Sequence, residues 1–200
     1  MRAADAGRSG APAPSRALVR ARGATAVGLA VLLAGCAAVG PAEPPPGPGR
    51  PAAPSLGWFS AIKAPPGHEP VLQLAARGVQ IFRCERGGEA FAWRFRQPEA
   101  ELLDGGMPVG RHGADFSFEH RDGSRLLGTV VAHDRAATGD LPWLLLSARS
   151  YGIGRFAGVS YVQRVNTSGG MPPPACSAAE ANQLLRVPFV ADFVFYRPGG

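Results

Sequence analysis

The amino-acid sequence predicts an all-β fold, a single antiparallel β-sandwich or small barrel-like domain of about nine short strands. Apolar and polar residues alternate in short runs along residues 56–200, as they do in strands with one buried face. Glycine-rich turn sequences separate these runs at regular intervals, which is typical of sandwiches and small barrels. Only residues 177–186 resemble a helix, and that helix would be short.

Each predicted strand is a run of four to seven residues rich in Val, Leu, Ile or aromatic side chains. The nine expected strands are residues 71–74, 79–84, 91–95, 100–103, 116–119, 126–132, 144–148, 159–165 and 190–196. The turns between them are expected at 77–78, 86–88, 104–106, 122–123, 138–140 and 168–170. In the last strand Ala191, Phe193 and Phe195 share one face and Asp192 lies on the other, so this strand should close the core.

The amino-terminal 35 residues differ in pattern from the rest of the chain. An apolar run of about ten residues follows an arginine-bearing start and ends at Leu33-Ala34-Gly35-Cys36. This order resembles a bacterial lipoprotein signal peptide. The run is shorter than the roughly 20 residues that a membrane-spanning helix needs, so a removable leader is expected. The resemblance implies lipidation of Cys36 and a bacterial cell-envelope protein, anchored to the outer membrane and facing the periplasm. An ordinary secretory leader that happens to contain a cysteine is the alternative.

Residues 36–55 form a Pro/Gly/Ala-rich segment between the leader and the domain. So many prolines exclude helix and sheet and favour a disordered, semi-extended tether. A lipid-anchored domain needs such a spacer to stand clear of the headgroups. Trp58, Phe59 and Ile62 then mark where the ordered domain, residues 56–200, should begin.

The charge of the chain argues against nucleic-acid binding. The full sequence has a net charge of +6, but five of its 21 basic residues and one of its 15 acidic residues lie in the leader. Sixteen basic and 14 acidic residues remain, so the rest of the chain carries +2. No cluster of basic residues with interleaved aromatic residues remains, and no nucleic-acid partner is expected.

Cys84 and Cys176 are the two cysteines left when Cys36 is set aside. Exported proteins fold where disulfides form and persist, so we expect these two residues to be bridged. Such a bridge would pin the proline-rich crossing before Cys176 to the strand that carries Cys84. The alternative is two free thiols too far apart to join.

Common catalytic motifs are absent from the sequence. It has no Gly-x-Ser-x-Gly elbow, no His-Glu-x-x-His, no Cys-x-x-Cys and no phosphate loop. The glycines of residues 152–158 lack dinucleotide-binding spacing and precede a predicted strand, so no cofactor is expected and a dehydrogenase is implausible. The four histidines are scattered without metal-ligand spacing, and no metal is expected: His68, His112, His120 and His133.

Seven segments of the domain follow, in order, the pattern of a known family. They are residues 76–84, 98–104, 109–112, 122–124, 141–146, 156–170 and 187–196. These segments resemble the exported domain-of-unknown-function family numbered 3455. Some fungal members carry the label malate dehydrogenase, but the missing dinucleotide fingerprint and the all-β pattern argue against that activity here. After His112 this chain departs from the family pattern Tyr-Ala-Gly-Pro-Thr-Trp-Glu, so an aromatic pocket built there would be altered.

Two groups of polar residues interrupt otherwise apolar strands and are the candidate site. Arg164 and its neighbours form one group, and His112 with Glu119 forms the other. The candidate binding residues are His112, Glu119, Gln163, Arg164, Asn166 and Thr167. Asn and Thr also cap turns, and Gln and Arg line wet sheet faces, so a purely structural role stays open.

Two functions are therefore open. The first is a lipid-anchored, non-catalytic binding or structural domain that recognises a small polar or carbohydrate ligand, with Arg164 as the anion contact. The second is a cofactor-independent hydrolase or isomerase in which His112 pairs with Glu119 or Glu101. Glu99 and Glu101 also share a strand face, which an ordinary wet sheet face explains as well. Convergence of His112, Glu119 and Arg164 in one pocket would favour the enzyme.

Overall fold

The computed structural model describes residues 51–200, and all of the strands named here lie in that range. The expected leader, its lipidation residue Cys36 and residues 36–50 of the expected tether lie outside the described residues. The eight strands are β1 (His68–Gly87), β2 (Ala90–Asp104), β3 (Met107–Gly113), β4 (Ser117–His120), β5 (Arg125–Asp134), β6 (Trp143–Tyr151), β7 (Tyr161–Gly169) and β8 (Leu184–Pro198). Two single 3₁₀ turns, η1 (Ala114–Phe116) and η2 (Ala178–Glu180), complete the regular structure of these residues.

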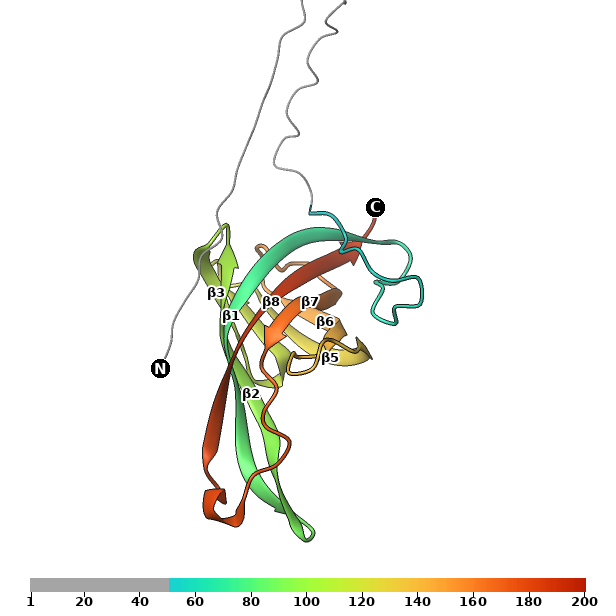
Figure 1. The fold of residues 1–200 in the computed structure, drawn as a ribbon. Helices are drawn as coiled ribbons and strands as arrows, with labels where there is room; N and C mark the ends of the chain where they lie inside the picture. Colours follow the sequence, from blue (N-terminus) through green and yellow to red (C-terminus); the bar gives the residue numbers. More distant parts are fainter. Residues whose placement is uncertain (1–50) are drawn as a thin grey trace, which may run out of the picture. The chain divides into compact units, whose positions relative to one another are not determined.

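The eight strands form a closed antiparallel barrel (Figure 1). Each strand pairs with the next along the chain, and β8 returns to pair with β1 from His68↔Pro198 to Arg83↔Leu184. The all-β fold is as predicted, and the barrel is the arrangement the chain adopts. Closure leaves no free sheet edge around the barrel itself, which an open sandwich of the same strands would have.

The predicted strands differ from the observed ones in number and length. Residues 71–74 and 79–84 belong to one strand, β1, and residues 91–95 and 100–103 belong to β2, while β3 was not expected. Gly78 explains the first error: a Cβ there would lie 2.1 Å from the carbonyl oxygen of Glu99. This glycine allows β1 and β2 to approach closely within the sheet and does not form a turn.

Three long strands extend beyond the barrel as an arm, defined here as residues 79–87, 90–99 and 184–188. Figure 1 shows β1, β2 and β8 continuing past the shorter strands. In this arm β1 is the central strand, because β3 pairs only with residues 100–104 of β2 and β7 pairs with β8 only from Phe189 onward. The sheet is thus both a barrel wall and a three-stranded projection.

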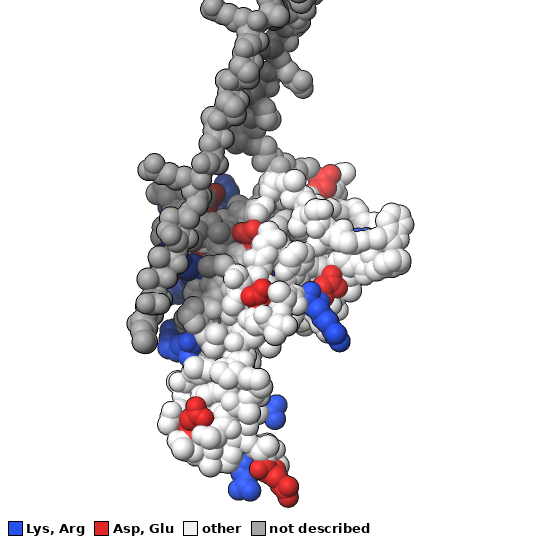
Figure 2. Space-filling view, in the orientation of Figure 1, with Lys and Arg blue, Asp and Glu red and all other residues white. Residues whose placement is uncertain are grey.

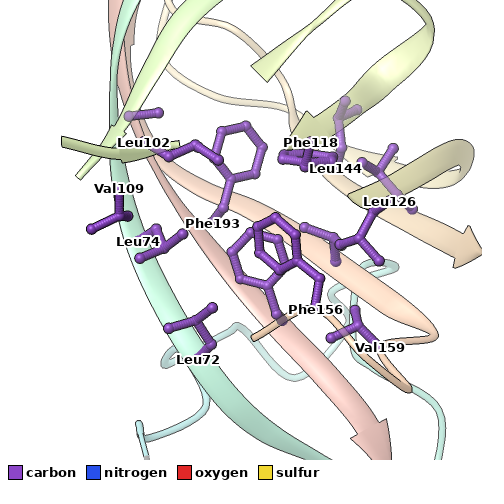
Figure 3. Packing of buried hydrophobic residues seen from close by; sticks show 14 residues of the cluster. Leu72, Leu74, Leu102, Val109, Phe118, Leu126, Leu144, Phe156, Val159 and Phe193 are labelled. Carbon is purple, nitrogen blue, oxygen red and sulfur yellow. The ribbon is translucent and has the colours of Figure 1, made fainter. Parts of the chain in front are cut away.

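The core fills the barrel with side chains from alternate positions of the strands (Figure 3). Phe193 and Phe195 of β8 are fully buried among them, and Ala191 on the same face is buried as well. The predicted closing role of this strand is confirmed. The main cluster comprises Leu72, Leu74, Ala76, Leu102, Val109, Phe118, Leu126, Leu144, Leu146, Phe156, Val159, Val162, Phe193 and Phe195.

The expected helix over residues 177–186 is wrong. Only the 3₁₀ turn η2 forms, closed by a capping box between Ser177 and Glu180. The following residues join the arm: Cys84 donates its backbone N–H to the Gln183 carbonyl, and Asn182 donates to the Cys84 carbonyl. Pairing with β1 therefore overrides the local helical tendency.

The predicted partnership of Cys84 and Cys176 agrees with the structure. Their Cα atoms lie 6.0 Å apart, as a disulfide requires, and 92 residues separate them in sequence. Cys176 lies in the connection between β7 and β8, so the pair fastens this connection to the arm. No helix in residues 51–200 has the length and apolar character needed to cross a membrane.

A short segment before β1 packs against the outside of the barrel. Ile62 is completely buried there against Leu145, Val165, Val194 and Tyr196 of β6, β7 and β8. The packed structure therefore includes Ile62, which precedes β1. Trp58 and Phe59, by contrast, are exposed. Around Gln163, Val165, Val194 and Tyr196 the outer face of β7 and β8 is consequently buried as the inner face is.

Candidate functional site

Strand β7 distributes the predicted site residues to both sides of the barrel wall. Arg164 pairs with Leu144 and Phe193, two residues of the interior core. Gln163 pairs with Leu145 and Val194, which belong to the outer cluster around Ile62. Adjacent residues of a strand point to opposite faces, so the two side chains cannot share one site.

The outer residue Gln163 is hydrogen-bonded at both ends of its amide. Its Nε2 donates to the Ile62 carbonyl oxygen at 2.5 Å, and the Tyr196 hydroxyl donates to its Oε1 at 2.5 Å. Burial raises the pKa of Tyr196 to about 12, so the phenol keeps its proton at neutral pH. This network ties the segment before β1 to the barrel and explains Gln163 as a structural residue.

The inner residue Arg164 is a buried cation without a carboxylate partner among residues 51–200. Its side chain is 5 % exposed, and Nε and Nη2 donate to the Pro142 carbonyl oxygen at 3.3 Å and 2.9 Å. Burial lowers the pKa of Arg164 to about 10, so the guanidinium still carries its charge at neutral pH. A guanidinium has five N–H donors, and Nη1 makes no hydrogen bond with any described residue.

His112 on β3 is the second buried polar group of the barrel interior. Its Nδ1 lies 2.9 Å from the Ser117 carbonyl oxygen, which can only accept, so Nδ1 carries the ring proton. Burial, opposed by that hydrogen bond and assisted by the positive charge of Arg164, lowers the pKa of His112 to about 4. The neutral ring therefore presents Nε2 as an acceptor, and this buried atom has no partner in the described part of the chain.

Arg164 and His112 flank the same aromatic residue. The His112 ring lies 5.0 Å from the Phe193 ring and stacks at 4.3 Å on Phe118, while Arg164 is the cross-strand neighbour of Phe193. Arg164 is a charged donor without a carboxylate partner among residues 51–200, and His112 is a neutral acceptor whose Nε2 has no partner among them. Together they offer complementary contacts to a group that has an anionic oxygen and a donor.

Gln80 is a further buried residue whose amide nitrogen lacks a partner among residues 51–200, and it was not among the predicted site residues. It lies on β1 opposite Pro98 and Val187, where the arm leaves the barrel. The available signal was its position as the one polar residue in the apolar run of residues 79–82. A buried amide in such a run requires a hydrogen-bond partner.

The other candidate residues do not join Arg164 and His112. Glu119 lies on the outer face, where its carboxylate and the Arg111 guanidinium are 2.6 Å apart. Asn166 is exposed at an irregularity of β7 and donates to the Asp192 carboxylate at 2.8 Å. Thr167 is buried, and its hydroxyl donates to the Leu141 carbonyl oxygen at 2.6 Å. Asn166 therefore links β7 to β8, and Thr167 links β7 to the segment before β6, so both have structural partners.

The acid/base pair expected for an enzyme does not come together. Glu101 is exposed on the outer face with its carboxylate 3.5 Å from Arg77, and Glu119 is on that face too. His112 points into the barrel, so the sheet itself separates it from both carboxylates. The cause is the two-residue period of a strand, since His112 pairs with inward-facing Phe118 and Arg111 pairs with Glu119.

A His-Asp-Ser group on the β4–β5 turn is structural. His120 lies 2.9 Å from Asp122, but the Ser124 hydroxyl donates to Asp122 at 2.6 Å and so is not activated by the histidine. Although desolvation opposes the effect, hydrogen bonds from Ser124 and Arg155 hold the pKa of Asp122 well below its usual value. Since Arg155 lies in the β6–β7 loop, this carboxylate joins two loops.

No cluster of three or more His, Cys, Asp or Glu side chains in residues 51–200 could hold a metal ion. The uncovered face in Figure 2 carries acidic and basic side chains mostly singly among uncharged atoms. Within the described residues, Arg164 and His112 are therefore the strongest candidates for a binding site. It suits recognition of a polar group.

The comparisons with known proteins address the family of the chain. A family model described as protein of unknown function (DUF3455) matches residues 105–197, which run from just before β3 into the end of β8. No curated protein and no solved structure matches the chain. The matched part contains both His112 and Arg164. The resemblance expected from the sequence is confirmed over these residues, which are similar to the DUF3455 family of proteins of unknown function.

Proposed function

We propose that this protein is a lipid-anchored component of the bacterial cell envelope whose barrel binds a small anionic ligand without chemical conversion. Two parts of the chain support the two halves of the proposal. The leader and Cys36 support export and anchoring. The barrel interior, with Arg164 and His112, supports ligand binding.

The observation that carries the binding function is the buried charge of Arg164, which has no carboxylate partner among residues 51–200. Moving a charged group out of water costs several kcal/mol, and a nearby opposite charge normally offsets part of that cost. Within residues 51–200 the Arg164 side chain has only the Pro142 carbonyl as a partner. A residue that opposes folding in this way is best explained by a bound anion that completes its pairing.

The two interior groups define the chemistry of the ligand. Arg164 suits a carboxylate or phosphate oxygen, because its remaining N–H donors are in a fixed planar arrangement. The Nε2 atom of neutral His112 accepts a hydrogen bond and so suits a hydroxyl. A small molecule with an acidic group and a hydroxyl, such as an acidic sugar, meets both requirements. This class falls within the small polar or carbohydrate ligands expected from the sequence.

The position of the carboxylates favours binding over catalysis. A hydrolase or isomerase of the kind considered above needs a base and an acid within reach of one substrate. Glu101 and Glu119 are engaged with Arg77 and Arg111 on the outer face. His112 alone, neutral and with a low pKa, is a weak base at neutral pH.

Thermal unfolding in the presence of candidate ligands tests the binding function. Acidic sugars and small hydroxy acids should raise the Tm of the wild type, and their neutral counterparts should not. The Arg164→Met variant should lose this response, whereas Arg111→Met, which changes an exposed arginine, should keep it. Stabilisation by no anion, or equal stabilisation of Arg164→Met, would contradict the proposal.

Metabolic labelling with palmitate tests the anchor. The wild type should incorporate label in a bacterial host and Cys36→Ser should not, because that cysteine is the proposed attachment point. The variant Cys84→Ser with Cys176→Ser should remain labelled and serves as the control for loss of a thiol elsewhere. Equal labelling of wild type and Cys36→Ser would remove the support for a lipid anchor.

A further inference from the structure

The turn at residues 57–60 exposes two large aromatic side chains next to each other. Trp58 is 85 % exposed and Phe59 is 94 % exposed, although both are strongly apolar. Single exposed apolar residues are common, but two adjacent aromatic rings on one projecting turn form a site with a large apolar area. We define these two residues as the aromatic tip.

The aromatic tip is held by bonds on both sides and is not a loose chain end. Within the turn, Ser60 donates its backbone N–H to the Gly57 carbonyl oxygen at 3.0 Å. The Asp134 carboxylate accepts from the Ser60 hydroxyl at 2.5 Å and from the Ala61 N–H at 3.0 Å. Ile62 is fully buried in the outer cluster. The fold thus keeps two apolar rings in water where local collapse would otherwise cover them.

The surroundings of the aromatic tip match the interfacial region of a bilayer. Lys63, the one lysine of the chain, places its ammonium 5.7 Å from the centre of the Trp58 ring and donates to the Trp58 carbonyl oxygen at 2.5 Å. Tryptophan with a neighbouring lysine is typical of the headgroup level, where the ring meets the acyl boundary and the ammonium meets phosphates. In Figure 2 the lobe formed by this part of the chain shows almost no charged atoms.

The length of chain before the aromatic tip fits a membrane partner. On the proposed lipid anchor, on which this inference rests, about 22 residues separate Cys36 from Trp58. At about 3.1 Å per residue for an extended proline-rich chain, they span up to roughly 70 Å. Docking is then intramolecular, with an effective concentration on the order of millimolar, so even weak insertion of two rings is sufficient.

We propose that Trp58 and Phe59 insert at the headgroup level of the membrane that carries the lipid anchor, with Lys63 contacting phosphate groups. The anchor keeps the protein at the membrane, and the aromatic tip fixes which face of the barrel meets it. The occupant of this surface is the lipid interface, and a second copy of the chain or another protein is the alternative that the test must separate.

Depth-dependent fluorescence quenching tests the proposal on the full, lipidated chain. The protein is reconstituted in vesicles of phosphatidylethanolamine and phosphatidylglycerol, with or without bromine on the acyl chains. In a Trp93→Phe, Trp143→Phe background Trp58 is the sole indole. Its emission should shift to the blue in vesicles and should be quenched by brominated lipid. The Trp58→Phe variant with the other two tryptophans retained gives the reciprocal measurement and should lose the quenched component.

Two further variants make the result specific. Phe59→Ser should reduce quenching of Trp58, because the tip loses half of its apolar area. Ile153→Ser changes another exposed apolar residue, 89 % exposed in the β6–β7 loop, and should leave quenching unchanged. If Ile153→Ser had the same effect as Phe59→Ser, the docking surface would not be the aromatic tip.

Different experimental results would overturn the proposed lipid anchor and the proposed membrane docking. A palmitate-labelled, vesicle-bound protein whose Trp58 stays unquenched would overturn docking and leave the anchor intact. A blue-shifted Trp58 that brominated lipid does not quench would show that a protein surface covers it, and would also overturn docking. A protein that neither incorporates palmitate nor associates with vesicles would overturn both proposals.

Discussion

Gln163 and Arg164 are neighbours on β7 and both are buried, but they lie on opposite sides of the barrel wall and differ in their hydrogen-bond partners. Gln163, 1 % exposed, is bonded at both ends of its amide to Ile62 and Tyr196 on the outside of the barrel. Arg164 on the inside has one backbone carbonyl for its charged group. The nearby His112 has a ring nitrogen without a partner in the described residues 51–200.

The difference is between a residue that stabilises the fold and a residue that lowers the free energy of unfolding. A buried polar group with complete hydrogen bonds contributes to stability. Removing one partner leaves the other buried without a hydrogen bond, which destabilises the protein. A buried charge without an opposite charge opposes folding. Sites for ligands are built from groups of the second kind, because the ligand supplies what the protein lacks.

Breaking the Cys84–Cys176 bridge gives the largest expected effect and sets a scale for the comparison. The pair closes a loop of 92 residues, so in the chain-entropy model reduction should lower the free energy of unfolding by up to about 4–5 kcal/mol. Urea unfolding with and without reductant measures this loss. The bridge lies away from both β7 residues, so its effect should add to theirs. Two titratable thiols in protein prepared without reductant would contradict the bridge.

The low pKa of His112 predicts the next largest effect, on the pH dependence of stability. Its pKa is about 4 in the folded protein and near 6.5 when unfolded, so the unfolded chain binds the proton more tightly between these values. The free energy of unfolding should therefore be unaffected by titration of this group above pH 6.5 and should fall by about 3 kcal/mol as the pH drops from 6.5 to 4. Urea unfolding across this range measures it.

A variant that cannot titrate provides the control for His112. His112→Gln should remove most of the slope of unfolding free energy against pH between 4 and 6.5, whatever its own stability. The variant His133→Gln, which changes an exposed histidine, should keep the wild-type slope. An unchanged slope in His112→Gln would mean that the ring is not buried in its neutral form.

Replacing Gln163 should destabilise the protein by an intermediate amount. Gln163→Leu leaves the Ile62 carbonyl and the Tyr196 hydroxyl unpaired in a dry cluster, at a cost of about 2 kcal/mol. Adding Tyr196→Phe removes one of the two orphaned groups and should recover part of the loss. Thermal unfolding of the two single variants and the double variant measures the coupling. Additive losses would show that the two side chains do not interact.

The sequence predicts the general fold well because a strand period of two is visible in residues such as Phe193 and Phe195. Local patterns did not distinguish a glycine that allows close strand approach from a glycine in a turn, so Gly78 was misassigned. The helix expected over residues 177–186 failed for a related reason, since its competitor was a long-range pairing with Cys84.

The site was harder to predict than the fold. Alternation along β7 already places Gln163 and Arg164 on opposite faces, but it does not say which face is inside. Both faces of β7 are buried at residues 162–165, because the segment around Ile62 covers the outer one, so Gln163 and Arg164 do not differ in burial. Only the three-dimensional structure shows that no carboxylate of residues 51–200 reaches Arg164 and that no donor of these residues reaches Nε2 of His112.

The effect of replacing Arg164 with an apolar residue of similar length is the most direct test of the central claim. That claim is that Arg164 serves a ligand and not the fold. The free energy of unfolding of Arg164→Met, measured with urea and without added anions, should then be equal to that of the wild type or higher by up to about 1 kcal/mol. The loss of the Pro142 contact is small beside the desolvation that the substitution relieves. Loss of about 2 kcal/mol or more, as expected for Gln163→Leu, would contradict the account and identify Arg164 as a structural residue.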